Sequence, residues 1–483
     1  MRLKKVTNTA MVLMMMFGLA ACSSNTNKDS AEAVTAQPSN AASATAAAGS
    51  VELQVLTDGS ISIGEGAATA LLPEKKATLI ADETLSPRVT DADFTYAKGQ
   101  TLSNPNTFSY FFMNLINEKL KSQNINLNVA DWGWGETLTQ KETAGFLASN
   151  IPDIIVGETQ MPGFAQQGQL EPFPEDMAAD IREKVAPAAW KPMEYDGKIY
   201  GLAAQPGVNS LFWNKALVKE AGIDPDKAPA TWDEWLADLK KVNDAGKGKF
   251  YGGGVYAGPN GGGYLRYGTL LLINNGAFAD AQGQPLFNSD ANVKTVEFLK
   301  ELNAFHPAGL MANQSEGAYF DAFKKGQIAY LIDGPWRATE SATLGIDYGM
   351  AKLPISAGGK DSNVTIGAAF NSVPKGAKNK EAAFEYIRQL YSEDIQNLIA
   401  DTGVRSPVLK SVAETDAYKQ AHPEMYQHYL AMSGDVQGLP TFAKSDTQVW
   451  QIFGDAVTKA LMTNGDIKGI LDDAQVKAEK ITK

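Results

Sequence analysis

Apolar positions along this chain repeat first with a helical and then with a strand spacing. Apolar side chains at positions 108, 111, 112, 115 and 116 keep the three-and-four spacing of a helix, and residues 125–129 alternate as a strand. A second strand is expected at 153–156, followed by a helix near 163–167. Helices and strands that alternate in this way predict an α/β lobe, in which helices flank a sheet.

The stretch before this lobe allows several interpretations. Residues 51–56, 77–81 and 94–96 each have the composition of a strand, and one of them is expected to begin the first lobe. The pattern does not choose among the three segments.

A helix, a strand and a turn are predicted between Ser315 and Arg337. Tyr319, Phe320 and Phe323 share one helical face, residues 328–332 form a short apolar strand, and the D-G-P turn then presents Trp336 and Arg337. An aromatic ring beside a guanidinium group suits a ligand cleft, because it combines a flat surface with a fork of hydrogen-bond donors. The alternative is a buried tryptophan after an ordinary turn.

Two tryptophan pairs receive different interpretations. Thr231 and Glu234 form the pattern of a capping box, and Trp232 and Trp235 follow with helical spacing, so that pair is predicted to be core. Residues 132–134 read W-G-W directly after the strand at 125–129. That second pair fits a ligand platform and a plug at the edge of a lobe equally well.

Length and charge narrow the class of protein. A chain of 483 residues suits two large lobes. Its net charge of −12 argues against nucleic acid as a partner and against a basic membrane-binding patch.

The first residues predict a secreted protein. Basic residues Arg2, Lys4 and Lys5 precede an apolar run at 10–20, which is too short to span a bilayer and ends in L-A-A-C at Cys22. This ending resembles a bacterial lipobox, which implies cleavage before Cys22 and a lipid on its thiol; a plain signal peptide with an incidental cysteine is the alternative. Residues 23–50 are rich in Ala, Ser, Thr and Asn and are expected to form a flexible tether.

No pattern for catalysis, a cofactor or a metal stands out. Cys22 is the only cysteine, and His306, His422 and His428 are the only histidines, in none of the arrangements used by hydrolases or zinc enzymes. The glycine-rich stretch at 252–263 lacks the lysine and hydroxyl residues of a phosphate-binding loop, and is expected either to let backbone approach a ligand or to form a loose turn. We therefore expect neither a cofactor nor a metal.

Several motifs, in order, resemble the sugar-binding proteins of ABC importers, the group of maltose-binding protein. They are F-K-K-G-Q-I-A-Y-L-I-D-G-P-W-R at 323–337, D-G-K-I-Y-G-L at 196–202, L-F-W-N-K at 211–215, N-N-G-A at 274–277 and the closing segment 471–483. The resemblance covers roughly residues 105–483. It implies an α/β, two-lobed periplasmic-binding-protein-like fold of type II, in which each lobe is a sheet flanked by helices and a hinge of several crossings joins the lobes.

The resemblance also implies where the chain passes between lobes. The expected crossings lie near 202–209, 364–370 and 404–407. The expected parts are a signal peptide at 1–21, a tether at 22–50, an N-terminal lobe at 51–205 plus 370–405, and a C-terminal lobe at 206–369 plus 406–483.

The family places aromatic rings against sugar, and matching positions here are candidates. The expected aromatic wall of the cleft consists of Tyr264, Tyr267, Trp336 and Trp450. The candidate polar and remaining aromatic contacts are Trp132, Trp134, Glu158, Thr159, Asp333, Arg337 and Arg405. Arg405, in the third crossing, fits a donor to a sugar hydroxyl and an ion pair that braces the hinge equally well. Near Gly157 and Gly207 the chain lacks family residues that hold maltose, which argues against maltose itself and not against a sugar.

The expected function is therefore that of a lipid-anchored extracytoplasmic receptor. It would capture a sugar, expected to be an oligosaccharide, between its lobes. It would then deliver this sugar to the permease subunits of an ABC transporter, whose ATPase is a separate chain. We expect a monomer that is not an enzyme and that meets the bacterial cell membrane through the lipid at Cys22 alone. The alternative is a cell-surface glycoside hydrolase or a carbohydrate adhesin.

Overall fold

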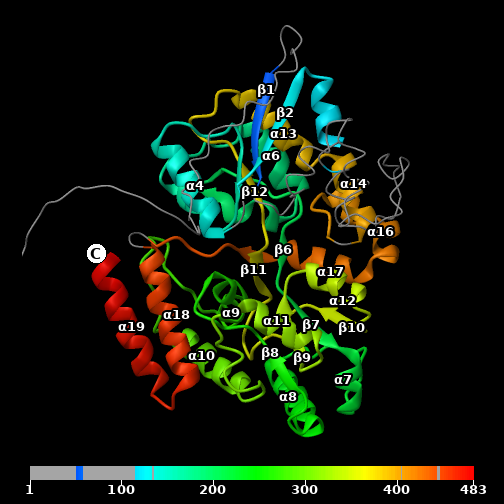
Figure 1. Cartoon of the computed structure of the whole chain (residues 1–483), viewed down its shortest axis with the longest axis vertical. Helices are drawn as coiled ribbons and strands as arrows, with labels where there is room; N and C mark the ends of the chain where they lie inside the picture. The colour runs from blue at the N-terminus through cyan, green and yellow to red at the C-terminus, as the bar shows by residue number, and fades with distance from the viewer. Residues whose placement is uncertain are drawn as a thin grey trace, which may run out of the picture. The chain divides into compact units, whose positions relative to one another are not determined.

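The computed structural model of the chain describes residues 51–57, 112, 115–132, 135–403, 405–442 and 446–482. Its helices pack against several small sheets (Figure 1). Cys22, the segments 1–21 and 22–50, and the strands expected at 77–81 and 94–96 lie outside the described residues. Within the described part of the chain, no helix is both long and apolar enough to cross a membrane.

The first group of elements contains two short ladders. β1 (Val51–Thr57) pairs in parallel with β2 (Ile125–Asp131), which confirms the strands expected at 51–56 and 125–129. β3 (Ile155–Gly157) pairs antiparallel with β12 (Phe370–Ser372). The helices of this group are α4 (Gly135–Leu147), α5 (Met161–Gln166), α6 (Glu175–Lys184), α13 (Lys380–Leu390) and α14 (Glu393–Thr402).

The strand expected at 153–156 begins later than predicted, at Ile155. Asp153 is buried, and its carboxylate accepts hydrogen bonds from the backbone N–H groups of Gln54, Lys378 and Asn379 (2.8–3.1 Å). Its side chain thus ties β1 to the segment after β12, a role that hydrophobic alternation does not reveal.

The second group of elements surrounds a four-stranded sheet in the order β10-β7-β9-β8. These strands are β7 (Ser210–Asn214), β8 (Tyr251–Gly254), β9 (Ile328–Asp333) and β10 (Tyr348–Ala351). The helices of this group are α7 (Lys215–Glu220), α8 (Trp232–Gly246), α9 (Gly261–Ile273), α10 (Asp290–Asn303), α11 (Glu316–Lys324), α12 (Trp336–Thr343), α18 (Asp446–Met462) and α19 (Ile467–Thr482).

Two of these helices begin where the capping residues in the sequence predict. Ser315 caps α11 by accepting from the Ala318 N–H, and β9 follows as predicted. Thr231 caps α8 by accepting from the Glu234 N–H, while the Glu234 carboxylate reaches back to the Ala230 N–H. Trp232 and Trp235 are buried, which confirms that this pair is core.

The glycine-rich stretch is more regular than expected. Residues 252–254 belong to β8, and Gly261–Gly263 form the first turn of α9, with Asn260 as the N-cap. Glycine lets β8 lie close to its neighbours: at Gly253, where φ is +77°, a Cβ would lie 2.5 Å from the Tyr330 carbonyl oxygen. The glycines at the two ends of the stretch therefore belong to a strand and to a helix start, and residues 255–260 form the loop between them.

The expected first and second crossings pair with one another. β6 (Gly207–Val208) runs antiparallel to β11 (Ser362–Ile366), which also pairs in parallel with β13 (Asp435–Gln437). Figure 1 shows β6 and β11 between the two groups of elements. The remaining elements are β4 (Glu194–Tyr195), β5 (Lys198–Ile199), α15 (Lys410–Ala413), α16 (Asp416–Ala421), α17 (Pro423–Met432) and the 3-10 turns Pro187–Ala189 and Lys191–Met193.

Candidate functional site

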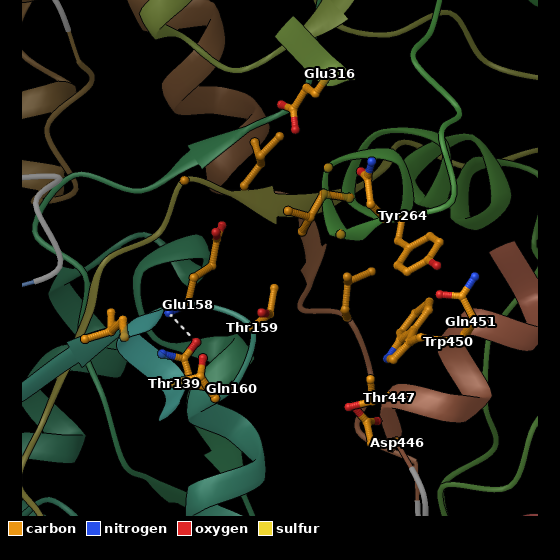
Figure 2. Close-up of a pocket in the computed structure, with 18 of the residues that line it drawn as sticks. Thr139, Glu158, Thr159, Gln160, Tyr264, Glu316, Asp446, Thr447, Trp450 and Gln451 are labelled. Carbon is orange, nitrogen blue, oxygen red and sulfur yellow. Dashed lines mark hydrogen bonds between the residues drawn. The ribbon is translucent and has the colours of Figure 1, made fainter. Parts of the chain in front are cut away.

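A cavity of about 1170 Å³ is lined by residues from both groups of elements. From the first group come α4 and the loop 158–160 that follows β3; from the second come residues in the first two turns of α9, α11, α12 and α18. Figure 2 shows Glu158 and Thr159 on the opposite side of the cavity from Tyr264 and Trp450. The polar and aromatic lining residues include Thr139, Glu158, Thr159, Gln160, Asn260, Tyr264, Arg266, Glu316, Phe320, Trp336, Asp446, Thr447, Trp450 and Gln451.

The loop after β3 is held by its own side chains. Gln160 accepts a hydrogen bond from the Glu158 N–H through Oε1 (3.2 Å) and donates from Nε2 to the buried carboxylate of Glu142 in α4 (2.9 Å). The Glu158 carboxylate accepts from the Ala368 N–H (3.2 Å), in the segment expected to form the second crossing. Glu158 is therefore held at the cavity wall and connected to that segment.

Two of the four expected aromatic wall residues form one stacked pair. The rings of Tyr264 in α9 and Trp450 in α18 lie 4.9 Å apart with an angle of 17° between their planes. Phe278 and Phe442 meet Trp450 edge to face at 4.9 and 5.1 Å. This packing holds Trp450 in one orientation at the cavity wall.

The other two wall residues differ from each other. Trp336 is half-buried and lines the cavity beside Ile366 and Gly367. Tyr267 is buried behind Tyr264, with their ring centroids 6.1 Å apart, and does not line the cavity. Tyr264, Trp336 and Trp450 thus share one cavity, whereas Tyr267 supports the wall from within.

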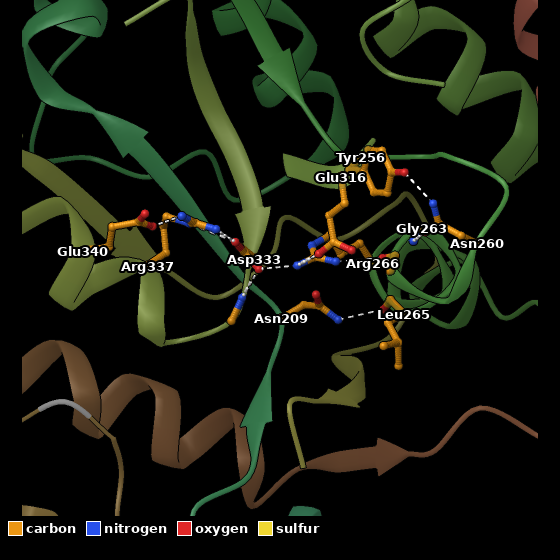
Figure 3. A network of polar contacts seen from close by, with 12 residues as sticks. Asn209, Tyr256, Asn260, Gly263, Leu265, Arg266, Glu316, Asp333, Arg337 and Glu340 are labelled. Atoms are coloured by element: carbon orange, nitrogen blue, oxygen red, sulfur yellow. Dashed lines mark hydrogen bonds and ion pairs between the residues drawn. The ribbon is translucent and has the colours of Figure 1, made fainter. Parts of the chain in front are cut away.

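Asp333 and Arg337 belong to a buried charge network (Figure 3). Asp333 accepts from Arg266 Nη2 (2.7 Å), from Arg337 Nε and Nη2 (2.9 and 2.6 Å) and from the Gly334 N–H (2.8 Å). Burial pushes the pKa of Asp333 upward, but the two guanidinium groups hold this pKa below its ordinary value. Neither Asp333 nor Arg337 lines the cavity, so their position does not support the expected direct contact with ligand.

Arg266 connects this network to the cavity. It is buried, lines the cavity, donates to the Gly262 carbonyl oxygen (2.8 Å) and forms an ion pair with Glu316 (2.9 Å), which also lines the cavity. The guanidinium groups of Arg266 and Arg337 lie 4.6 and 4.4 Å from the centre of the Phe320 ring. The network therefore fixes the Glu316 carboxylate at the wall.

Of the remaining predicted residues, neither Arg405 nor Trp132 lines the cavity. The Arg405 guanidinium lies over the Trp336 ring, 5.4 Å from its centre, and burial lowers the pKa of Arg405 to about 10. Trp132 is half-buried and does not line the cavity; its carbonyl oxygen accepts from Lys141 Nζ. Trp134 lies outside the described residues.

Sequence reasoning missed Arg266, Glu316 and Asp446. The signal for Arg266 was present, because it is the only charged residue in the otherwise uncharged helix G-G-G-Y-L-R-Y-G-T-L-L-L-I. A charge in such a helix predicts a buried partner. Burial raises the pKa of Asp446 although it accepts hydrogen bonds from the Phe442 N–H and from Trp450, and no local sequence signal indicated this position.

Among the described residues, no cluster of three or more histidine, cysteine or acidic side chains could hold a metal ion. The cavity itself offers flat rings, amide and hydroxyl groups and three carboxylates, those of Glu158, Glu316 and Asp446. Such a lining suits a ligand that has both apolar faces and many hydroxyl groups.

Comparison with known proteins gives consistent results. Residues 104–397 match the family model described as bacterial extracellular solute-binding protein. The galactooligosaccharide-binding protein of Bacillus subtilis (strain 168) is 26% identical over 346 residues, covering 69% of this chain and 77% of that protein. A maltooligosaccharide ABC transporter solute-binding lipoprotein of Streptococcus pneumoniae (strain R6) is 25% identical over 345 residues, covering 68% and 75%.

A solved structure shares the fold. The cyclic alpha-maltosyl-1,6-maltose binding protein from Arthrobacter globiformis superimposes with a TM-score of 0.67 at 21% identity, covering 90% of this chain and all of that one. This likeness confirms the α/β, two-lobed fold class expected from the sequence.

Proposed function

Because the chain belongs to the bacterial extracellular solute-binding proteins, we propose that its cavity captures an oligosaccharide and that the protein delivers this sugar to an ABC transporter. One observation carries the proposal: Trp336 and the stacked Tyr264–Trp450 pair share a cavity with the carboxylates of Glu158 and Glu316. Sugars present apolar C–H faces, which suit flat rings, and hydroxyl groups, which donate to carboxylates. The relatives named for galacto- and maltooligosaccharides support this ligand class.

The size of the cavity favours an oligosaccharide over a single sugar. Its volume of about 1170 Å³ exceeds the range of roughly 300–1,000 Å³ that is typical for small-molecule sites. The rings of Trp336 and Trp450 also come from separate helices, α12 and α18, so different sugar units can use them.

Membership of this family supports a location outside the cytoplasm and an interaction with a transporter. The lobe boundaries, the lipid anchor, the monomeric state and the separate permease and ATPase chains are proposals. We assign the N-terminal lobe to 51–205 plus 370–405 and the C-terminal lobe to 206–369 plus 406–483. A lipid on Cys22 would anchor the monomer to the cell membrane, and separate chains would supply the permease and the ATPase. Ligand that bridges the lobes would favour the closed state through contacts that only this state provides.

Calorimetric titration with maltotriose, galactotriose, arabinotriose and mannotriose tests the proposal. We expect one or more of these neutral trisaccharides to bind, and chromatography of the released sugar to return it unchanged, as a receptor requires. Cleavage of the sugar would favour the hydrolase alternative.

The Trp336→Ala variant tests the proposed aromatic contact. By analogy with aromatic hot spots, loss of the ring should cost about 2 kcal/mol of binding free energy, or roughly thirtyfold in affinity. Tyr195→Ala is the matched control, because it removes an aromatic side chain that is 45% exposed and does not line the cavity. If Trp336→Ala bound each sugar as tightly as the control does, Trp336 would have no part in the site.

A further inference from the structure

The indole of Trp336 lies in a cradle of glycines. A Cβ on Gly334 would lie 2.2 Å from Cη2 of the indole, and a Cβ on Gly367 would lie 2.4 Å from Cζ3. A Cβ on Gly207 would lie 3.4 Å from the same Cζ3 atom. Only glycine at 334 and 367 lets the backbone approach the six-membered ring this closely.

Two cradle residues and one cation belong to the three crossings. Gly207 is in β6, in the first crossing; Gly367 directly follows β11, in the second; and Arg405 is in the third. The Arg405 guanidinium lies 5.4 Å from the centre of the Trp336 ring, within the range of a cation–π contact. One side chain therefore lies close to a residue of each connection between the proposed lobes.

The crossings are also bound to one another. β6 pairs with β11 through Val208 and Thr365. The buried His428 of α17 accepts from the Val208 N–H through Nε2 (3.1 Å), and its Nδ1 lies 2.9 Å from the Ser406 hydroxyl. Since the crossings are coupled in this way, a group that restrains one of them restrains all three.

We propose that Trp336 is a positioning residue for the hinge: its six-membered ring, seated against Gly207, Gly334 and Gly367 and covered by Arg405, limits the relative movement of the three crossings. The inference rests on the proposed function, because it assigns a second role to a ring that also lines the ligand cavity. Sugar stacked on Trp336 would hold the ring in its cradle and thereby favour one hinge geometry. The site and the hinge would then share a single side chain.

Trp450 provides the contrast. It also lines the cavity, but its ring stacks on Tyr264 and meets Phe278 and Phe442 edge to face, and none of these three residues belongs to a crossing. A change at Trp450 should therefore alter affinity without altering the hinge.

Distances between spin labels test the inference directly. In a Cys22→Ala background, introduced cysteines are the only thiols, because Cys22 is the only cysteine in the chain. Labels at Ala179 and Ala237, exposed alanines of α6 and α8, report the distance between the proposed lobes. Electron–electron resonance then gives the distance distribution without sugar and with the tightest-binding trisaccharide.

Trp336→Phe is the informative variant, since phenylalanine keeps a flat face but cannot fill the cradle that the indole fills. We expect a broader distance distribution in the ligand-free Trp336→Phe protein than in the parent, and a parental distribution in Trp450→Phe. Arg405→Lys, which keeps the charge and loses the planar group, should broaden the distribution in the same direction.

The outcomes separate the two proposals. Parental distributions in both Trp336→Phe and Arg405→Lys would overturn the hinge role, whatever the protein binds. Equal broadening in Trp336→Phe and Trp450→Phe would also overturn it, because a loosened cavity would then explain the result. Failure of the parent to bind any trisaccharide would instead count against the proposed function, since the ligand-free distributions do not depend on sugar.

Discussion

Replacing Asp333 with asparagine removes the charge on which two buried guanidinium groups converge. Asp333 has no exposed surface, and Arg266 and Arg337 are 2% and 4% exposed. Asparagine has nearly the same shape, so the variant leaves the packing in place and changes the electrostatics. Its amide would also turn a donor toward guanidinium groups that can only donate.

The expected loss of stability follows from this arrangement. Removing one partner of a buried ion pair typically costs about 3–5 kcal/mol, because it leaves an uncompensated charge in the interior. Arg266 keeps Glu316 and Arg337 keeps Glu340, so each arginine retains one carboxylate. We therefore expect the lower end of the range, a decrease of about 3 kcal/mol in the free energy of unfolding.

Urea unfolding followed by circular dichroism at pH 7 measures this change. Glu340→Gln is the matched control: it removes a carboxylate from the same network, but this side chain is 32% exposed and its loss should cost about 1 kcal/mol or less. A loss in Asp333→Asn that is no larger than the loss in Glu340→Gln would refute the view that burial makes this network sensitive.

Three further predictions concern other parts of the chain. Cys22→Ala should move the protein from the membrane fraction to the soluble extracytoplasmic fraction, and a variant that stays membrane-bound would place the anchor elsewhere. Burial lowers the pKa of His306 to about 4 and of His428 to about 3, so the unfolded chain binds more protons below pH 6.5. The contribution of each histidine to stability should thus be almost fully present at pH 7 and should fall by about 2 kcal/mol by pH 5. A free energy of unfolding in urea that stayed constant across this range would contradict the prediction. Three of the four charged side chains that line the cavity in the described chain are carboxylates. A trisaccharide that ends in glucuronic acid should therefore bind roughly tenfold or more weakly than its neutral counterpart. Equal affinities of the two sugars by calorimetry would contradict this.

Local features of this structure were predictable because their signals lie within a few residues of each other. Ser315 and Thr231 cap helices that begin at the next residue, and Trp235 follows Trp232 on the same buried face. The same holds for the α/β fold class, since both the helical and the strand periodicity are short-range.

The cavity was harder to predict because its residues meet only in space. Trp336 and Arg337 are neighbours in sequence, but successive helical residues point about 100° apart, so one lines the cavity and the other faces Asp333. The partner that completes the network, Arg266, lies 67 positions before Asp333.

Tyr267 illustrates a second limit. Tyr264 and Tyr267 have the spacing of a shared helical face, yet Tyr264 lines the cavity and Tyr267 does not. From Gly263 to Ile273 every residue of α9 is buried. Periodicity cannot assign the face toward a ligand in a helix that is covered on all sides.

The pairing of β3 with β12 has a consequence for the order in which the chain can fold. The strand at Ile155–Gly157 forms its ladder with Phe370–Ser372, and Asp153 receives hydrogen bonds from residues 378 and 379. A growing chain therefore cannot complete this first group of elements until more than 200 further residues have been synthesised. Contacts so distant in sequence form slowly. A protein made inside the cell and used outside it gains time from this delay, because the first group of elements stays incomplete while the chain is still available for export.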